Sequence, residues 1–263
     1  MLKKLLDMPN DSLGKTFGVA AVLCLAASIL VSGAAVALRP MQASNKLIDM
    51  RRNILEIGGL YDAGKSVEEQ FAQIDTQFID LRTGEFVEGY DAESYDPRSA
   101  AKDPAASVKL AASEDQASIK RQASVMPVYL VKNGEDISRL ILPVHGYGLW
   151  STLYGFLALE PDTKTVIGLG FYEHAETPGL GGEVDNPNWK ALWKGKEVYD
   201  QDFNVAISVI KGNVQASDPE AMHKVDGLAG ATLTSAGVSN LMQFWLSDLG
   251  YGPFLTKFRD TRG

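Results

Sequence analysis

The longest apolar stretch of the chain runs from Thr16 to Leu38 without a charged residue, between Lys15 and Arg39. A helix of about 20 residues crosses the hydrocarbon core of a bilayer, so this stretch predicts a transmembrane helix. A cleaved signal peptide is the alternative, because Ala35–Ala37 resembles a small-residue cleavage site. We favour a retained anchor, since the stretch exceeds the roughly 7–15 residues of a signal core. Lysine and arginine counts on its two sides do not fix the orientation.

Beyond the apolar stretch the pattern predicts short helices and strands. A helix is expected from Ser44 to Leu60, ending at the glycine pair before Leu60. The S-x-x-E capping box at Ser66 predicts a short helix through Gln73. Residues 77–87 predict two strands joined by a turn at 82–84. Residues 99–124 are rich in Ala, Ser, Lys and Asp, and predict a solvated excursion or a loose helix.

In the second half of the chain, apolar and polar residues alternate as they do in the strands of a sheet. This half ends in an amphipathic helix. Asn133-Gly134 is a hairpin signal between two apolar runs. The expected strands are Val128–Val131, Ile137–Pro143, Gly148–Leu159, Val166–Tyr172 and Val205–Ile210. Apolar residues repeat at spacings of three and four from Ser235 to Leu249, which predicts a helix. Clustered strands with flanking helices indicate an α+β fold with a mixed sheet.

Composition excludes several classes of site. The 263 residues carry a net charge of −8, and no basic stretch alternates with aromatics, so we expect no nucleic-acid partner. The single cysteine, Cys24, excludes a disulfide framework and a cysteine-ligated metal site within the chain. The three histidines lack metal-binding spacing, and we expect no metal site.

A small-residue turn at the start of the last helix is the strongest candidate site. Residues 226–235 read DGLAGATLTS, and Gly227 and Gly230 permit close backbone approach. The hydroxyls that follow stand where free amides and the helix dipole attract anions. An ordinary helix cap, with Thr234 or Ser235 as the capping residue, is the alternative. The residues alone leave both interpretations open.

These residues resemble the flavinylation motif D-x-x-(S/T)-G-A-T of membrane flavoproteins. The longer stretches VDGLAGATLTSAGV from Val225, FWLSDLGYGPFLTKFR from Phe244, PVHGYGLWSTLYGFLAL from Pro143 and HAETPGLGGE from His174 resemble the NqrC family of the sodium-translocating NADH:quinone oxidoreductases. The resemblance covers nearly the whole chain. One position departs from the motif, because Ala229 stands where Ser or Thr is usual.

The resemblance implies a covalent cofactor. Thr232 would be esterified to the phosphate of FMN by a separate magnesium-dependent flavin transferase, which uses FAD and releases AMP. Asp226 would serve recognition by that transferase or its metal. Gly230, Ala231, Leu233 and Thr234 would surround the attached group.

Three other segments supply candidate flavin contacts. The loop after His174 offers Glu176, Thr177, Gly179 and Leu180, with a plain tight turn as the alternative. Trp150 would place an aromatic ring near the flavin, or else belong to the core. Lys211 would approach the phosphate, or else be solvated. We expect Trp189 and Trp193 to be packing residues, and no acid–base catalytic set, because no nucleophile accompanies Glu173, His174 and Glu176.

The resemblance also implies a place in the cell. Residues 1–15 would be cytoplasmic, 16–38 would span the bacterial inner membrane, and 39–263 would form one periplasmic FMN-binding domain.

The resemblance further implies a role in electron transfer, as one of six subunits. The chain would receive single electrons from an iron–sulfur centre in the membrane subunits. It would pass them to the FMN of the large subunit, which also holds riboflavin, and they would continue to quinone. Alternatives are the homologous flavin-carrying subunit of the Rnf ferredoxin:NAD oxidoreductase complex, a membrane-anchored binding module without redox function, and a free-standing enzyme.

Overall fold

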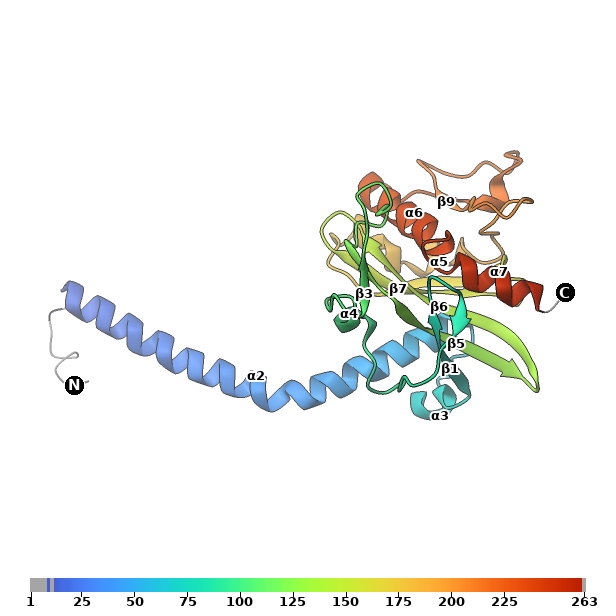
Figure 1. Ribbon diagram of the computed structural model, residues 1–263. Helices are drawn as coiled ribbons and strands as arrows, with labels where there is room; N and C mark the ends of the chain where they lie inside the picture. Colours follow the sequence, from blue (N-terminus) through green and yellow to red (C-terminus); the bar gives the residue numbers. More distant parts are fainter. Residues whose placement is uncertain (1–8, 10–11, 262–263) are drawn as a thin grey trace. The chain divides into compact units, whose positions relative to one another are not determined.

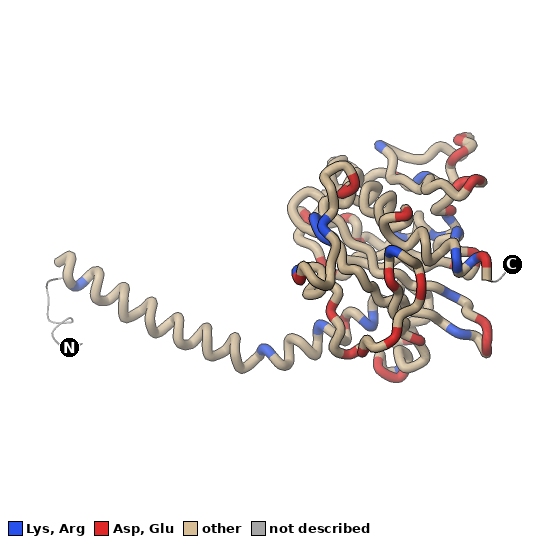
Figure 2. Tube along the Cα trace, viewed as in Figure 1, with Lys and Arg blue, Asp and Glu red and all other residues tan. Residues whose placement is uncertain are grey.

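The chain begins with one long helix. The computed structural model describes residues 9 and 12–261, in which α2 runs unbroken from Leu13 to Ile57 and includes Pro40. The two helices expected from the sequence are therefore joined through Pro40. No charged residue occurs between Lys15 and Arg39, and this part of α2 is uniformly tan in Figure 2. The helix is long and apolar enough to cross a membrane.

The described residues divide into two compact units, which meet between Ile48 and Asp49. A six-stranded sheet organises the second unit, in the order β2-β1-β5-β6-β7-β8 and antiparallel at every pairing (Figure 1). The strands are β1 (Ile74–Asp80), β2 (Glu85–Phe86), β5 (Val125–Asn133), β6 (Asp136–Tyr147), β7 (Thr152–Leu159) and β8 (Val166–Glu173). The predicted hairpins are confirmed, and Gly134 takes the left-handed conformation that its turn requires.

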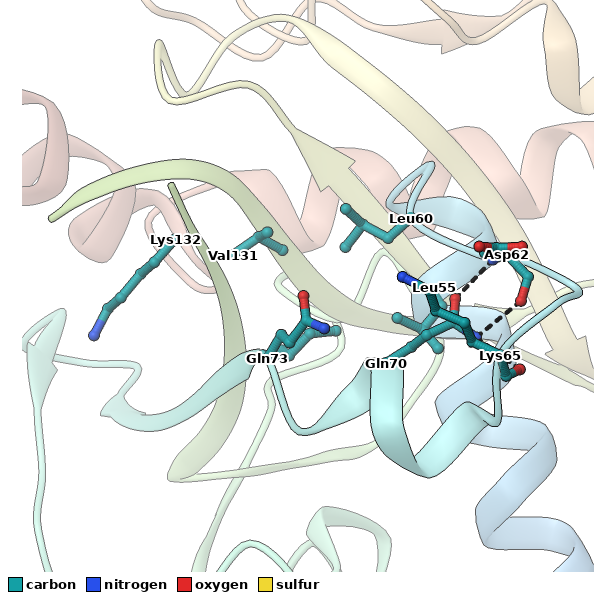
Figure 3. A pocket seen from close by; sticks show the side chains of 9 residues that line it. Leu55, Leu60, Asp62, Lys65, Gln70, Gln73, Val131 and Lys132 are labelled. Atoms are coloured by element: carbon teal, nitrogen blue, oxygen red, sulfur yellow. Dashed lines mark hydrogen bonds between the residues drawn. The ribbon is translucent and has the colours of Figure 1, made fainter. Parts of the chain in front are cut away.

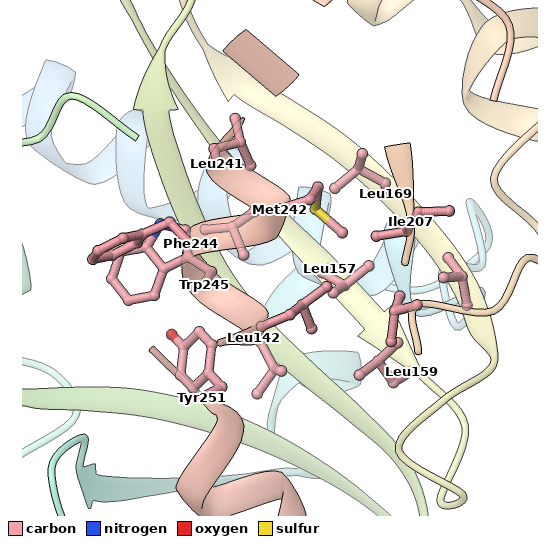
Figure 4. Packing of buried hydrophobic residues seen from close by; sticks show 14 of the residues in the cluster. Leu142, Leu157, Leu159, Leu169, Ile207, Leu241, Met242, Phe244, Trp245 and Tyr251 are labelled. Atoms are coloured by element: carbon pink, nitrogen blue, oxygen red, sulfur yellow. The ribbon is translucent and has the colours of Figure 1, made fainter. Parts of the chain in front are cut away.

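Apolar residues on β6 and β7 alternate between two cores, because successive strand side chains point to opposite faces. On one face, Leu140, Leu142 and Leu157 belong to one core with Leu241 and Met242 of α6 (Thr232–Leu246), and Figure 4 shows Leu142 and Leu157 beside the two α6 residues. On the other face, Ile141, Phe156 and Ala158 pack with the end of α2, where Ile54, Leu55 and Ile57 are buried. The last turns of α2 are thus core residues of the domain.

The remaining elements are short. They are the helices α3 (Val67–Phe71), α4 (Pro97–Ala100), α5 (Pro187–Ala191) and α7 (Gly252–Asp260), the 3-10 turns η1 (Gly181–Asp185) and η2 (Ala221–His223), and the strand pairs β3–β4 (Ser107–Lys109 with Arg121–Ala123) and β9–β10 (Ser208–Val209 with Lys224–Val225). The capping box is confirmed, since Ser66 accepts a hydrogen bond from the Glu69 amide. Parallel pairing is confined to β9 with β10 among the described strands. The α+β class is confirmed, but the predicted mixed sheet is wrong, because every pairing in the six-stranded sheet is antiparallel.

The segment 99–124 differs from the solvated excursion that its composition predicted. It contains the antiparallel pair β3–β4, and Leu110, Ala117 and Ala123 are buried in the domain core. The Asp115 carboxylate accepts the amides of Ile119 and Lys120, at 2.7 and 2.8 Å. Backbone hydrogen bonds and these three buried side chains therefore order a segment that has hardly any large apolar residues.

Candidate functional site

The first turn of α6 leaves its amides free. The capping position is Ala231, which has no side-chain acceptor, and within the described chain the amides of residues 232–234 have no hydrogen-bond partner. Helix N-terminal amides of this kind bind anions. Thr232, the first helical residue, is exposed, and Leu233 is 61% exposed. The free amides that the predicted anion site requires are therefore present, and Thr232 lies at their edge.

The alternative of a hydroxyl cap is wrong for this helix, because α6 begins three residues before the expected start. Thr234 and Ser235 lie inside the helix and are buried. Ser235 accepts the Leu228 amide at 3.0 Å, which ties the turn before the helix to its first turn. Thr234 points the other way and donates to Glu176 at 2.7 Å.

Glu176 joins three segments that are far apart in the sequence. Its carboxylate accepts the amides of Leu149, Trp150 and Ser151 at 2.9 to 3.2 Å. The Thr234 hydroxyl supplies a further donor from α6. The loop of residues 176–182, the β6–β7 turn (residues 148–151) and the start of α6 are thereby held together.

The charge of Glu176 is stabilised by these donors. Burial, the largest influence, would by itself raise the pKa of this carboxyl, which is 5% exposed. The hydrogen bonds from Thr234 and from the amides of the β6–β7 turn together outweigh burial and lower the pKa. Glu176 is thus ionised at neutral pH and joins the three segments through these hydrogen bonds.

Glycines allow this close packing. A Cβ at Gly181 would lie 2.5 Å from the Thr234 Oγ1 and 2.8 Å from the Glu176 Oε2, and a Cβ at Gly148 would lie 2.7 Å from the Glu176 Oε1. Gly230 has a φ of +72° and approaches the Leu180 side chain. Sequence reasoning did not single out Gly148 and Gly181 as contacts of Glu176, although both lie in glycine-containing stretches that carry the resemblance.

Apolar side chains around this junction are exposed. Trp150 is 66% exposed, so its assignment to the core is wrong, and Leu149 and Leu180 are 38% and 44% exposed. With Leu233 they border the first turn of α6, since Glu176 binds the Leu149 and Trp150 amides and Leu180 faces Gly230. Leu149 was missed by sequence reasoning. Exposed apolar residues gathered at one place indicate a binding surface.

Lys211 and Thr232 line one small cavity of about 110 Å³, together with Gly227. The Lys211 side chain is exposed at its border, so the structure brings the predicted cation to the predicted attachment residue. Asp226 has a local structural role, because its carboxylate accepts the Val214 amide at 2.8 Å and its carbonyl accepts the Trp189 indole at 2.8 Å. Trp189 and Trp193 are buried, as expected of packing residues.

The loop before Leu180 is a tight turn as well as part of the site. The Thr177 carbonyl accepts the amides of Leu180 and Gly182, and Gly179 has a φ of +76°. His174 braces the start of this loop, because its Nδ1 accepts the Glu176 amide at 3.2 Å while its Nε2 contacts Asp185 at 2.8 Å. The Thr177 side chain is exposed at the surface of the turn.

A separate pocket lies between the end of α2 and β5 (Figure 3). The side-chain amide of Gln70 fills its hydrogen-bonding capacity with the backbone of Asp62 and the carbonyl of Lys65, at 2.7 to 3.1 Å. The side-chain amide of Gln70 is therefore used within the chain.

Comparison with known proteins decides the family. The family model of the FMN-binding domain matches residues 148–247, which include all the predicted site residues. The NqrC subunit of the Na⁺-translocating NADH-quinone reductase from Pseudomonas aeruginosa is 54% identical over 254 residues, covering 95% of this chain and 97% of that protein. This chain belongs to the NqrC family.

Other members of the NqrC family agree. The Yersinia pestis protein is 45% identical over 256 residues, covering 95% of both chains. The crystal structure of Shewanella oneidensis NqrC has a TM-score of 0.75 and 34% identity, and the match covers 81% of this chain and 97% of that one. The fold is therefore that of the NqrC family, and the alternative of an Rnf-complex subunit is not favoured.

Proposed function

We propose that this chain is the FMN-carrying electron-transfer subunit of a Na⁺-translocating NADH-quinone reductase, with FMN joined to Thr232 by a phosphoester. The observation that carries the proposal is the exposed Thr232 hydroxyl on a helix turn with free amides. Membership of the NqrC family and the match to the FMN-binding domain support it.

The residues present fit a flavin phosphate and a flavin ring. The amides of residues 232–234 offer donors to phosphate oxygens, and Lys211, which lines the same cavity as Thr232, offers a positive charge. Trp150, Leu180 and Leu233 offer apolar surface to a flat ring. Bound FMN would supply one-electron chemistry, and the protein would supply position and electrostatics.

Attachment requires a displacement at phosphorus. The Thr232 oxygen attacks the flavin-side phosphorus of FAD, the phosphoanhydride bond breaks, AMP leaves, and the hydroxyl proton passes to solvent or to a base of the flavin transferase. The exposed Thr232 suits access by a second enzyme. Because the bond is covalent, the carrier cannot diffuse away from its partners.

In this proposal the chain works within a complex at the bacterial inner membrane, anchored by residues 16–38 with residues 39–263 in the periplasm. Its partners are five other subunits. Electrons arrive from the iron–sulfur centre of the membrane subunits and leave to the FMN of the large subunit, which also carries riboflavin.

The test is flavin fluorescence in a denaturing gel together with the intact mass, after expression with the flavin transferase. We expect a fluorescent wild-type band whose mass has increased by one FMN less one water. Thr232→Ala should remove both signals completely. The matched control is Thr256→Ala on α7, an exposed threonine outside the FMN-binding region, which should keep both.

Two results would contradict the proposal. A wild-type band without fluorescence would make the chain an unmodified binding module. Fluorescence that persists in Thr232→Ala would move the ester to another hydroxyl.

A further inference from the structure

A second cavity, of about 900 Å³, opens beside the β3–β4 segment and the ends of β6 and β7. Four of its lining residues are basic, namely Arg98, Lys102, Lys120 and Arg121, and none is acidic. Figure 2 shows blue positions along the β3–β4 segment. Such a concentration of positive charge is unexpected in a chain whose net charge is −8.

Two of these cations have no partner within the described chain. Lys102 and Lys120 are exposed and form no ion pair with any described carboxylate. Arg98 is engaged, because it bonds Glu173 at 2.8 Å and lies 3.4 Å above the ring of Tyr154. Arg121 donates to Ser107. The cavity therefore holds two cations whose charges are available to a ligand.

The loop that presents Lys120 has a fixed shape. Ser118 and Lys120 have φ values of 54° and 66°, a region that residues other than glycine rarely adopt. Asp115 holds the loop there through the amides of Ile119 and Lys120. The nearby carboxylate is thus bonded to backbone, and the Lys120 side chain remains available.

Aromatic side chains form another part of the lining. His145 stacks on Tyr154 with ring centroids 5.4 Å apart and an interplanar angle of 22°. Burial and then the neighbouring Arg98 lower the pKa of His145 to about 4, so its ring is neutral at pH 7. Within the described chain no hydrogen bond to its ring nitrogens is formed, and a neutral imidazole offers one donor and one acceptor. Tyr147 is 46% exposed at the border.

We propose that this cavity binds a small anionic ligand that carries a flat ring, of the nucleoside-phosphate class. Its phosphate would pair with Lys102 and Lys120, and its ring would lie on Tyr147 and bond His145. The volume lies within the roughly 300–1,000 Å³ of small-molecule sites.

The cavity adjoins the candidate flavin site through one turn. Tyr147 and Thr152 pair at the end of the β6–β7 hairpin and line the cavity. Residues 149–151 between them donate their amides to Glu176. A ligand that orders Tyr147 therefore acts on the turn that carries Trp150. Ligand binding here can be measured on the unmodified chain, so a failure of this proposal is distinguishable from a failure of the proposed flavin attachment.

The experiment titrates the full-length chain in detergent with AMP, and separately with inorganic phosphate, and follows heat release and tryptophan fluorescence. We expect saturable binding of one AMP per chain and at least tenfold weaker binding of phosphate, because phosphate lacks the ring. Lys102→Gln and Lys120→Gln should each weaken AMP binding by about tenfold, the effect of losing one charge-assisted bond.

The matched control is Lys194→Gln, another exposed lysine outside this cavity, which should leave AMP binding unchanged. Thermal unfolding of each variant, with a midpoint equal to that of the wild type, establishes that the chain is folded. Three results would overturn the proposal: no saturable AMP binding, equal binding of phosphate and AMP, or equal weakening by Lys194→Gln and Lys120→Gln.

Discussion

At the scale of single residues, Glu176 is a buried carboxylate whose oxygens accept donors from two other segments of the chain. We expect Glu176→Gln to lower the free energy of unfolding by about 1.5–3 kcal/mol, the usual contribution of hydrogen bonds to a charged group. Urea unfolding at pH 7 measures this change. The control is Glu135→Gln, an exposed turn residue, which should change the free energy by less than about 0.5 kcal/mol.

The same residue predicts a pH dependence. Its folded-state pKa lies below the reference value of 4.5, so the unfolded chain binds the proton more tightly. The stabilisation is complete above this reference pKa and is lost as the pH falls through the folded-state pKa. Unfolding measured between pH 7 and the acid limit should show a shallower decline for Glu176→Gln. Identical slopes for wild type and variant would contradict this role.

Ala229 provides a prediction about modification. It is exposed directly before Gly230, at the position where the flavinylation motif usually has a hydroxyl. We expect Ala229→Ser to raise the rate of flavin attachment severalfold in a time course with the transferase, because a hydroxyl adds a hydrogen-bond donor beside the phosphate. The control Ala112→Ser, an exposed position outside the FMN-binding region, should not change the rate. A lower rate of flavin attachment for Ala229→Ser would contradict this prediction.

At the residue scale, the sequence could single out a candidate where a local motif carried the information. Thr232 could be singled out because its neighbours in the sequence are also its neighbours in space. The role of Thr234 could not, because its partner Glu176 lies 58 positions away and nothing local marks the pair. The exposure of Trp150 was equally hidden, since apolar character alone does not separate core from binding surface.

At the scale of elements, α6 packs closely on the β6–β7 turn. A Cβ at Gly237 would lie 2.5 Å from the Tyr147 carbonyl oxygen and 2.9 Å from the Gly148 Cα. Helix propensity alone predicts that Gly237→Ala stabilises the helix by about 1 kcal/mol. We expect the opposite sign, a destabilisation of about 1–3 kcal/mol, because α6 must move away from the turn.

Chemical denaturation of Gly237→Ala and of Asn240→Ala tests this. Asn240 lies on the exposed side of the same helix, so its replacement by alanine should be neutral or slightly stabilising. If both substitutions raise the free energy of unfolding, the β6–β7 turn moves away from α6 without destabilising the domain.

Element prediction was reliable for strands with a clear alternation and for capped helices. It failed for β3 and β4, whose pairing depends on contacts from the rest of the domain. It also divided α2 at Pro40, because proline interrupts most helices and no local signal shows that the following turns continue as helix.

At the scale of the whole molecule, the end of α2 belongs to the folded domain. Ile54, Leu55 and Ile57 cover the sheet face formed by Ile141, Phe156 and Ala158. We expect a chain that begins at Asp49 to fold as a soluble domain. A chain that begins at Gly58 should lose at least about 3 kcal/mol of the free energy of unfolding, because it exposes that face. Thermal melts of both chains measure the difference, and equal melting temperatures would contradict it.

The Glu176 junction also has a kinetic consequence. Its donors, at residues 149–151 and 234, meet only after the β6–β7 hairpin has formed and the chain has returned through α6. Contacts that close such long loops form late in folding. We therefore expect the first turn of α6 to acquire its final shape late in folding, so an enzyme that acts on Thr232 in that shape would select chains that have completed the domain.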